Sequence, residues 1–306
     1  MYVGVDLGAT HLRTAIADAD TTVATHSTAT PTDDGDAVAD AICTAVTTVC
    51  EAADIAPSAV TAVGAATIGP VRRGRVHAPP NLPAIASIPI VGPLETLTNA
   101  PVTHRNDAIA GLIGERRAGA PPDTVYLTMS TGIGAGACVD GHVLTGHAGN
   151  AAEVGHLTVD HADTLTCGCG ATGHWEAYCG GANIPAHAAH LHASTDLDTT
   201  IPLETAVDAA TILAAEDPLT DRLRDRIAEY TTRGLATITH AYAPETIIVG
   251  GAVARNHPES LIAPARDRLP DRVVTDAPRV TLTTLDNPVL AGAIALARDT
   301  DPGHTT

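Results

Sequence analysis

The order of its segments predicts an α/β fold for this chain of 306 residues, and two observations carry the prediction. Strand-like apolar runs alternate with segments of helical periodicity along most of the chain. In addition, a strand, a turn of small residues and two further strands occur in that order at the N-terminus and again from residue 124. The doubling predicts two α/β domains with an active-site cleft between them.

The first half of the chain opens on strands and continues with a helix. The predicted strands span residues 2–7, 12–17, 21–25 and 60–65. Apolar residues at helical spacing between 38 and 49 follow an Asp-rich start, and this pattern predicts a helix. We expect the Pro-rich segment 69–101 to be a long irregular loop rather than part of the core.

The second half repeats this opening. Its predicted strands lie at 124–129, 135–139 and 246–249, and its helices at 221–241 and 290–297. Asp140 and Gly141 form a hairpin turn. We therefore predict an N-terminal α/β domain of residues 1–108, completed by a C-terminal helix at 290–306, and a larger C-terminal α/β domain of residues 109–289 that contains a loop rich in Cys and His.

The composition is strongly acidic. The chain has 35 Asp and Glu against 17 basic residues, all of which are Arg, and its net charge is −18. Such a charge repels nucleic acid and anionic membranes, and scattered acids of this kind are typical of a halophile, whose salty cytoplasm screens them. We find neither a signal peptide nor a membrane span, so we expect a soluble cytoplasmic protein without nucleic-acid or membrane partners.

Two turns of small residues are candidate phosphate sites. Asp6, Gly8 and Thr10 place a carboxylate, a bare backbone and a hydroxyl at the end of the first strand, where Asp6 can hold Mg²⁺ directly or through water. Thr131 and Gly132 begin the second turn, in a Gly-rich run. Each turn is equally compatible with an ordinary hairpin, because neither matches a Walker-type phosphate loop.

Two further short motifs carry alternative interpretations. Asp107 stands at the start of a predicted helix, where it serves either as an N-cap or as the general base that accepts a proton from a substrate hydroxyl. Asn106 beside it can hold another hydroxyl. Gly250 and Gly251 end a buried strand; their bare backbone allows an adenine ring to lie against it, or simply turns the strand into a helix.

The richest cluster combines cysteine and histidine. Its possible metal ligands are His156, Cys167, Cys169 and His174. Two Cys and two His are enough for a closed tetrahedral zinc site, although the spacing is not that of a common zinc finger. A redox pair is the rival interpretation, but Cys-Gly-Cys lacks the usual two-residue spacer. Glu153 and Glu176 flank the cluster, either as ligands of sugar hydroxyls or as surface acids.

In this order, the motifs resemble the ROK family of sugar kinases. The matching segments are Gly4 to Thr10, Pro80 to Pro83, Asn106-Asp107, Thr131 to Gly134, Glu153 to His156, and Glu176. The resemblance implies the actin-like ATPase fold, which belongs to the ribonuclease H-like group. It further implies that ATP and Mg²⁺ are used and that Asp107 is the catalytic base. The implied sugar ligands are Asn81, Asn106, Asp107, Glu153, His156 and Glu176.

The chain departs from the family pattern in three places. His174 stands where the family has the third Cys of its structural zinc site, and His156, Cys167 and Cys169 match the other ligands. Ala9 replaces a usual Gly, and Ile68 lies where the family has the first Pro of a Pro-Gly-Pro turn. Because His is a good zinc ligand, the resemblance still implies one structural Zn²⁺.

The expected function is therefore ATP-dependent phosphorylation of a hexose, with glucose the first choice of substrate. N-acetylmannosamine, N-acetylglucosamine and fructose remain alternatives, and so does polyphosphate as donor. A sugar-responsive regulator is disfavoured because the chain begins at the first strand and has no basic recognition helix. Retention of Asp6 and Asp107 argues against an inactive sugar-binding protein. We expect a homodimer or homotetramer.

Overall fold

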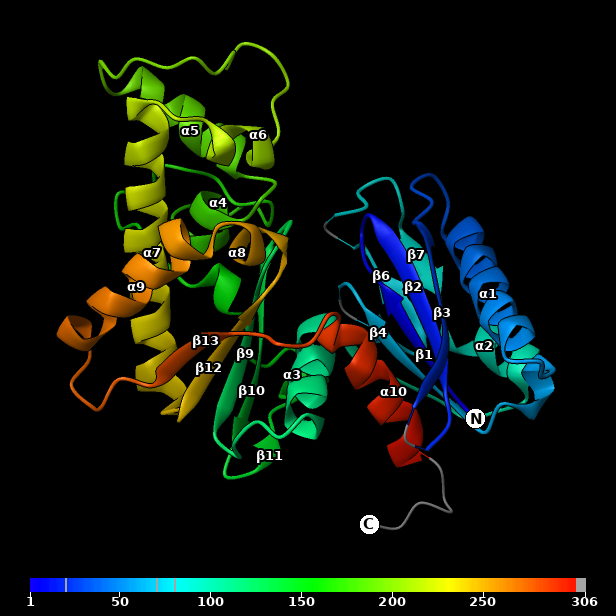
Figure 1. The fold of residues 1–306 in the computed structure, drawn as a ribbon. Helices are drawn as coiled ribbons and strands as arrows, with labels where there is room; N and C mark the ends of the chain where they lie inside the picture. Colours follow the sequence, from blue (N-terminus) through cyan, green and yellow to red (C-terminus); the bar gives the residue numbers. More distant parts are fainter. Residues whose placement is uncertain (20, 70, 80, 301–306) are drawn as a thin grey trace. The chain divides into compact units, whose positions relative to one another are not determined.

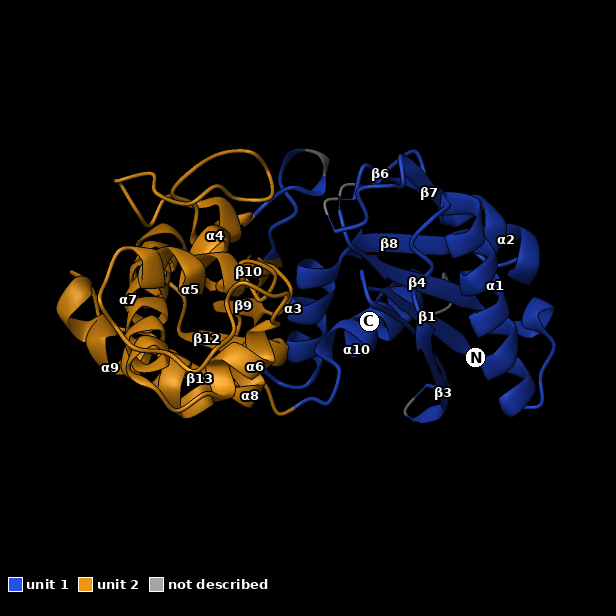
Figure 2. Ribbon diagram, turned by 90° about the horizontal axis from the view of Figure 1, so that it is seen from above, with its two compact units in different colours: residues 1–120, 143–151, 285–306 blue, residues 121–142, 152–284 orange. Residues whose placement is uncertain are grey.

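A computed structural model describes residues 1–300 except 20, 70 and 80. The chain divides into two compact units, which Figure 2 shows in different colours. The first unit comprises residues 1–120, 143–151 and 285–306, and the second comprises 121–142 and 152–284. Each unit is built on its own five-stranded sheet.

The sheet of the first unit has the strand order β3-β2-β1-β4-β8. Its strands are β1 (Tyr2–Leu7), β2 (His11–Ala17), β3 (Thr22–Ala29), β4 (Ala62–Thr67) and β8 (Val102–Asn106). Strand β1 runs antiparallel to β2 and parallel to β4, and β4 runs parallel to β8. The carboxyl ends of β1, β4 and β8 therefore meet at one edge, which is where ligands bind in open α/β sheets.

Helices cover both faces of this sheet. They are α1 (Gly35–Ala52), the short η1 (Pro57–Ala59), α2 (Val91–Thr98), α3 (Asp107–Arg117) and α10 (Pro288–Thr300). Val38, Ile42 and Val46 of α1 pack into the main core with Val3 and Val5 of β1, whereas α10 packs on β1, β4 and α3 (Figure 1). This contact is close because Gly64 has no side chain, and a Cβ there would overlap the carbonyl of Ala293.

The expectation of an irregular loop at 69–101 is wrong. The segment forms a small sheet of β5 (Val71–Arg72), β6 (Arg75–His77) and β7 (Ser87–Pro89), followed by α2. Val76, Ile88 and Leu94 are fully buried in the main core, so isolated apolar residues between Pro and Gly anchor the segment. Pro70 and Pro80, which belong to the motifs noted above, lie outside the described residues, as do the last six residues of the predicted C-terminal helix.

The second unit repeats the sheet of the first. Its strand order is β11-β10-β9-β12-β13, with β9 (Thr124–Met129), β10 (Ile133–Val139), β11 (His142–Val143), β12 (Thr246–Gly250) and β13 (Arg279–Leu282). Strand β9 pairs antiparallel with β10 and parallel with β12, which is parallel to β13. The doubling read from the sequence is thus confirmed as two sheets of the same topology.

Helices and short turns complete the second unit and its connections. They are η2 (His147–Gly149), which belongs to the first unit, then η3 (Val154–His156), α4 (Trp175–Cys179), α5 (Ile184–Ala193), α6 (Ala209–Ala214), α7 (Pro218–Tyr242), α8 (Ala252–Asn256), η4 (Pro258–Ile262), α9 (Ala263–Arg268) and η5 (Leu269–Arg272). Asp217 caps α7 by accepting a hydrogen bond from Thr220 N, and Trp175 of α4 packs against Gly234. In the described part of the chain, no helix combines the length and apolarity needed to cross a membrane.

Candidate active site and metal site

The first phosphate turn follows β1 and is held internally. Gly8 N donates a hydrogen bond to His11 O at 3.0 Å. Thr30 pins the same turn, because its hydroxyl donates to Gly8 O at 2.8 Å and its N–H donates to Thr10 O at 3.0 Å. The N–H groups of Ala9 and Thr10 have no acceptor among the described residues. The turn is therefore a fixed backbone segment that offers two donors.

The second turn, between β9 and β10, has the same character. Ser130 N donates to Gly132 O at 2.9 Å, and Ser130 O and Thr131 O accept hydrogen bonds from the chain that follows α4. Within the described chain, the N–H groups of Thr131 and Gly132 again lack an acceptor. Consecutive free N–H groups in a rigid turn form an anion-binding concavity, so each unit supplies one such turn.

Asp6, at the end of β1, is only 5% exposed. Its Oδ2 accepts hydrogen bonds from Asn287 Nδ2 at 3.3 Å and Arg13 NH1 at 3.4 Å. Burial raises the pKa of the Asp6 carboxyl, and the contacts with Asn287 and Arg13 lower it again in part. Sequence analysis singled out Asp6 but neither of its partners.

Asn106 and Asp107 mark the boundary between β8 and α3. The N-cap is Asn106, whose Oδ1 accepts a hydrogen bond from Ala108 N at 2.9 Å. Asp107 is the first helical residue, and its Oδ1 accepts from the same N–H at 2.9 Å. The interpretation of Asp107 as an N-cap is therefore wrong. Its carboxylate lies at the positive end of α3 and at the same sheet edge as Asp6.

The predicted sugar loop is anchored next to that edge. Leu82 N donates to Pro79 O and Ile85 N donates to Leu82 O, both at 3.0 Å. Leu82 and Ile85 are buried in the core of the first unit, whereas Asn81, directly before Leu82, is exposed. The loop is thus fixed by apolar residues and presents a polar side chain to solvent.

Glu176, in the first turn of α4, connects two predicted features of the second unit. Its Oε2 accepts a hydrogen bond from Ile133 N, at the start of β10, at 2.9 Å. Its Oε1 lies 3.7 Å from the Sγ of Cys167. Glu176 therefore joins the second phosphate turn to the cysteine cluster and is not a solvated surface acid.

The four predicted zinc ligands do come together. The ligand atoms of His156, Cys167, Cys169 and His174 all lie within 4.8 Å of one another. Cys167 Sγ is 3.7 Å from His156 Nδ1, and Cys169 Sγ is 3.3 Å from His174 Nδ1. Around a tetrahedral zinc, sulfur and nitrogen ligands are about 3.6 Å apart, given the usual Zn–S and Zn–N bond lengths. The residues present therefore fit this ion.

The segment that carries Cys167, Cys169 and His174 belongs to the second unit, and its two ends lie side by side. Thr158 forms an antiparallel bridge with His174, and Trp175 N donates to Leu157 O at 2.9 Å. Tyr178 ties the segment to α4, because its hydroxyl donates to Asp160 Oδ2 at 2.6 Å and accepts from the backbone further along the segment. Burial and the carboxylate of Asp160 raise the pKa of Tyr178 to about 12, so the phenol stays a donor.

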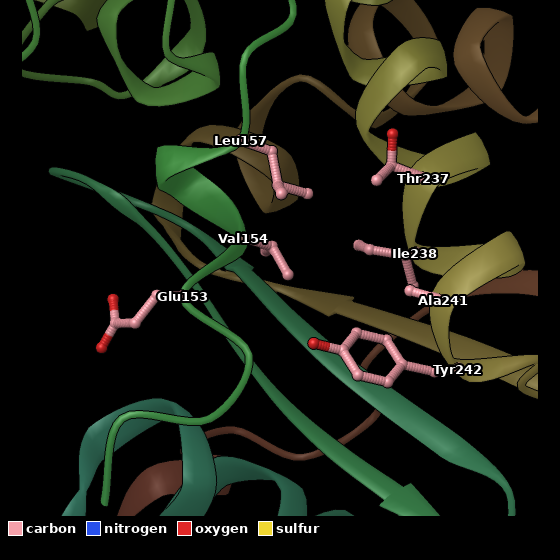
Figure 3. Close-up of a pocket in the computed structure, with 7 residues that line it drawn as sticks. All are labelled: Glu153, Val154, Leu157, Thr237, Ile238, Ala241 and Tyr242. Atoms are coloured by element: carbon pink, nitrogen blue, oxygen red, sulfur yellow. The ribbon is translucent and has the colours of Figure 1, made fainter. Parts of the chain in front are cut away.

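Glu153 and His156 lie at the two ends of η3. Gly155 between them is required because a Cβ there would overlap the carbonyl of Ile133. A cavity of about 100 Å³ lies between η3 and α7, with Val154, Ile238 and Tyr242 in its lining. Figure 3 shows the Glu153 carboxylate directed away from these apolar residues, so this cavity is not where Glu153 would bind a sugar.

Gly250 and Gly251 form a strand-to-helix turn between β12 and α8. A Cβ on Gly250 would meet the hydroxyl of Tyr126, and one on Gly251 would meet the backbone of Met129. Both α-carbons are thus covered by atoms of the same unit. An adenine ring therefore cannot lie where the side chains of Gly250 and Gly251 would be, and it would have to contact this segment from another side.

Comparison with known proteins agrees with the resemblance to sugar kinases. The ROK family model matches residues 2–300. A glucokinase from Pyrobaculum calidifontis is 35% identical over 260 residues, which cover 84% of this chain and 80% of the relative. An N-acetylmannosamine kinase from Escherichia coli is 35% identical over 195 residues, or 62% and 64% of the two chains. A solved ROK family glucokinase from Streptomyces griseus, in complex with glucose and AMPPNP, is 29% identical with a TM-score of 0.79 over 97% of this chain and 99% of that one.

Fold, site and comparisons together define a sugar kinase of the hexokinase or glucokinase type with the actin-like ATPase fold. The chain belongs to the ROK family.

Proposed function

We propose that this protein transfers the γ-phosphoryl group of ATP to a hydroxyl of a hexose, with glucose as the preferred substrate and glucose 6-phosphate as the product. The observation that carries the proposal is the pair of rigid turns, each of which offers two consecutive N–H groups without an acceptor among the described residues. Such donors suit the phosphates of a nucleotide. Thr10 and Thr131 add hydroxyls to the two turns.

Asp107 is the proposed general base. Its carboxylate accepts the proton of the sugar hydroxyl while the hydroxyl oxygen attacks the γ-phosphorus and ADP leaves. Asn106 and Asn81 lie on the same unit and hold neighbouring hydroxyls. Phosphoryl transfer needs little covalent help from the protein, so positioning of the hydroxyl and stabilisation of charge account for most of the rate.

Glu153, His156 and Glu176 are the proposed sugar ligands of the second unit. If His156 binds a metal through Nδ1, its Nε2 remains for a hydroxyl, since Nδ1 is the atom that faces Cys167. The backbone bond from Ile133 fixes the Glu176 carboxylate. Two carboxylates and a histidine suit a pyranose with several free hydroxyls, and the glucokinase relatives favour glucose. The N-acetylmannosamine kinase relative keeps that sugar as the second candidate.

Two metal ions complete the proposal. Asp6 would hold Mg²⁺, which neutralises phosphate charge when bound, and it fits because only Oδ2 is engaged by the described residues. His156, Cys167, Cys169 and His174 would hold a structural Zn²⁺, which fixes the segment between Glu153 and Glu176.

Replacement of the base tests the catalytic role. Asp107→Asn should lower kcat by about three or more orders of magnitude, because the amide keeps a polar contact but accepts no proton. Sugar binding, measured by calorimetry, should change little. Turnover within about tenfold of the wild type would show that the proton goes to another group.

The substrate is tested by coupled measurement of ADP release over a panel of hexoses. The panel contains glucose, fructose, N-acetylglucosamine and N-acetylmannosamine, each with ATP and with polyphosphate as donor. We expect the highest kcat/KM for glucose with ATP. A higher value for N-acetylmannosamine would reverse the assignment, and no turnover of any hexose would refute the proposed function.

A further inference from the structure

The side chain of Asn287 makes two hydrogen bonds with different elements. Its Oδ1 accepts a hydrogen bond from Leu290 N at 3.0 Å, and this is the geometry of an N-cap for α10, with Pro288 as the first helical residue. Its Nδ2 donates to Asp6 Oδ2 at 3.3 Å. The residue therefore links the start of the last helix to the carboxylate at the end of the first strand.

Arg13 supplies a second donor to the same oxygen. It lies directly opposite Asp6 in the pairing of β1 with β2, and its guanidinium donates to Oδ2 at 3.4 Å. The described residues give Oδ1 no donor. The carboxylate is thus held from two neighbouring elements through one oxygen, and the other oxygen is left for a ligand.

Such a support matters because Asp6 is only 5% exposed, so its carboxylate depends on donors from the protein more than an exposed carboxylate does. A buried carboxylate without donors is costly, and a misplacement of about 1 Å in a catalytic group reduces the rate by orders of magnitude. Mg²⁺ also demands near-ideal octahedral geometry from its ligands and waters. A side chain that fixes the carboxylate therefore acts on binding of the magnesium–nucleotide complex as well as on turnover.

We propose that Asn287 is a positioning residue for phosphoryl transfer, which holds Asp6 through Oδ2 so that Oδ1 is presented to the magnesium–nucleotide complex. The proposal rests on the proposed kinase function. It adds a residue that no motif indicated, because Asn287 is 281 positions from its partner. Arg13 assists from the other side.

Three substitutions separate the two purposes of Asn287. Asn287→Ser keeps an oxygen that caps a helix but removes the amide donor. Asn287→Asp also keeps the cap, and it places a second carboxylate beside Asp6. Asn287→Ala removes both the cap and the donor. Asp34→Ala is the matched control, because Asp34 caps α1 in the same unit and accepts from Asp36 N without contacting Asp6.

In Asn287→Ser we expect a melting temperature within about 2 °C of the wild type and a kcat lower by about tenfold to a hundredfold, the range for one hydrogen bond to a charged group. KM for the sugar should stay within about twofold. Calorimetry with AMPPNP should show weaker binding in the presence of Mg²⁺ and unchanged binding in EDTA. Asn287→Asp should reduce kcat and magnesium-dependent affinity for AMPPNP further than Asn287→Ser. Asn287→Ala should in addition have a lower melting temperature, and we expect the same of Asp34→Ala.

A wild-type kcat and a wild-type magnesium-dependent affinity in Asn287→Ser would overturn the proposal. The proposal would also be overturned if Asn287→Ala differed from the wild type only by a lower melting temperature like that of Asp34→Ala. Loss of the helix cap alone would then explain the effect of the substitution. Failure of the kinase function gives a different result, since the wild type itself would then phosphorylate no hexose.

Discussion

His187 connects the stability of the second unit to pH through one buried ring. It is 3% exposed, and its Nδ1 donates to Tyr178 O at 2.9 Å. The rings of Tyr178 and Tyr230 lie 5.3 and 6.0 Å away. Burial lowers the pKa of His187 to about 4, so the ring stays neutral in the folded protein at pH values where it is protonated in the unfolded chain.

The sign of the pH effect follows from that difference. Between about pH 6.5 and pH 4 the unfolded state binds a proton that the folded state does not, so the free energy of unfolding falls as the pH falls. Above about pH 6.5 this contribution is fully present. His187→Gln, which keeps a donor for Tyr178 O, should show a shallower loss of melting temperature over this window than the wild type.

Thermal unfolding at a series of pH values measures this effect. His192→Gln is the matched control, because His192 lies exposed on the same helix and should keep the wild-type slope. Equal slopes for His187→Gln and the wild type would mean that other groups carry the acid sensitivity.

At the residue level, sequence reasoning singled out the groups whose chemistry stands out within a short motif. Asp6, Asp107 and the four possible zinc ligands all belong to segments where a carboxylate, thiol or imidazole follows a strand or a Gly-rich turn. The supporting residues were missed. Thr30 and Asn287 are ordinary polar residues in the sequence, and their roles come from contacts with positions 22 and 281 residues away.

At the level of elements, most strands of the two sheets were predicted, but β8, β11 and β13 were not. The bounds of β1 and β9 agree with the sequence prediction, since both strands are apolar runs with turn residues at each end. The small sheet at 71–89 was missed because its strands are two or three residues long. Strands this short have no periodicity of their own, and their pairing with one another and burial in the core define them.

The segment between Glu153 and Glu176 is the element whose order we expect to depend on metal. Elemental analysis should find about one zinc per chain, because four ligands close a single tetrahedral site. His174→Ala should lose the metal, lower the melting temperature and raise KM for the sugar, since the free energy of binding a structural metal contributes to folding.

Two variants serve as controls for this experiment. His174→Cys should retain zinc, because it restores a third thiolate. His161→Ala should leave the zinc content unchanged, since His161 is an exposed residue of the same segment outside the ligand cluster. Protein without zinc that phosphorylates sugar normally would show that His174 has no role in a metal site.

At the scale of the whole molecule, the net negative charge determines how stability and activity depend on salt. A net charge of −18 without any Lys produces self-repulsion that only dissolved ions screen, and the screening length falls to about 3 Å at about 1 M salt. We predict that the protein requires molar salt, so its activity and melting temperature should both rise steeply with KCl. Neutral osmolytes should not replace the salt fully. Full activity and an unchanged melting temperature in dilute buffer would refute this prediction.

The position of α10 determines when the first unit can be completed during synthesis. Helix α10 comes from residues 288–300, yet it packs on β1 and β4 of the N-terminal sheet and covers Ala15, Ala17 and Ala66. Domains usually fold on the ribosome in the order in which they are made. Here the second unit lies within residues 121–284 and can fold first. One apolar face of the N-terminal sheet stays uncovered until α10 has been synthesised. During that interval the nascent chain exposes a surface that a chaperone can bind.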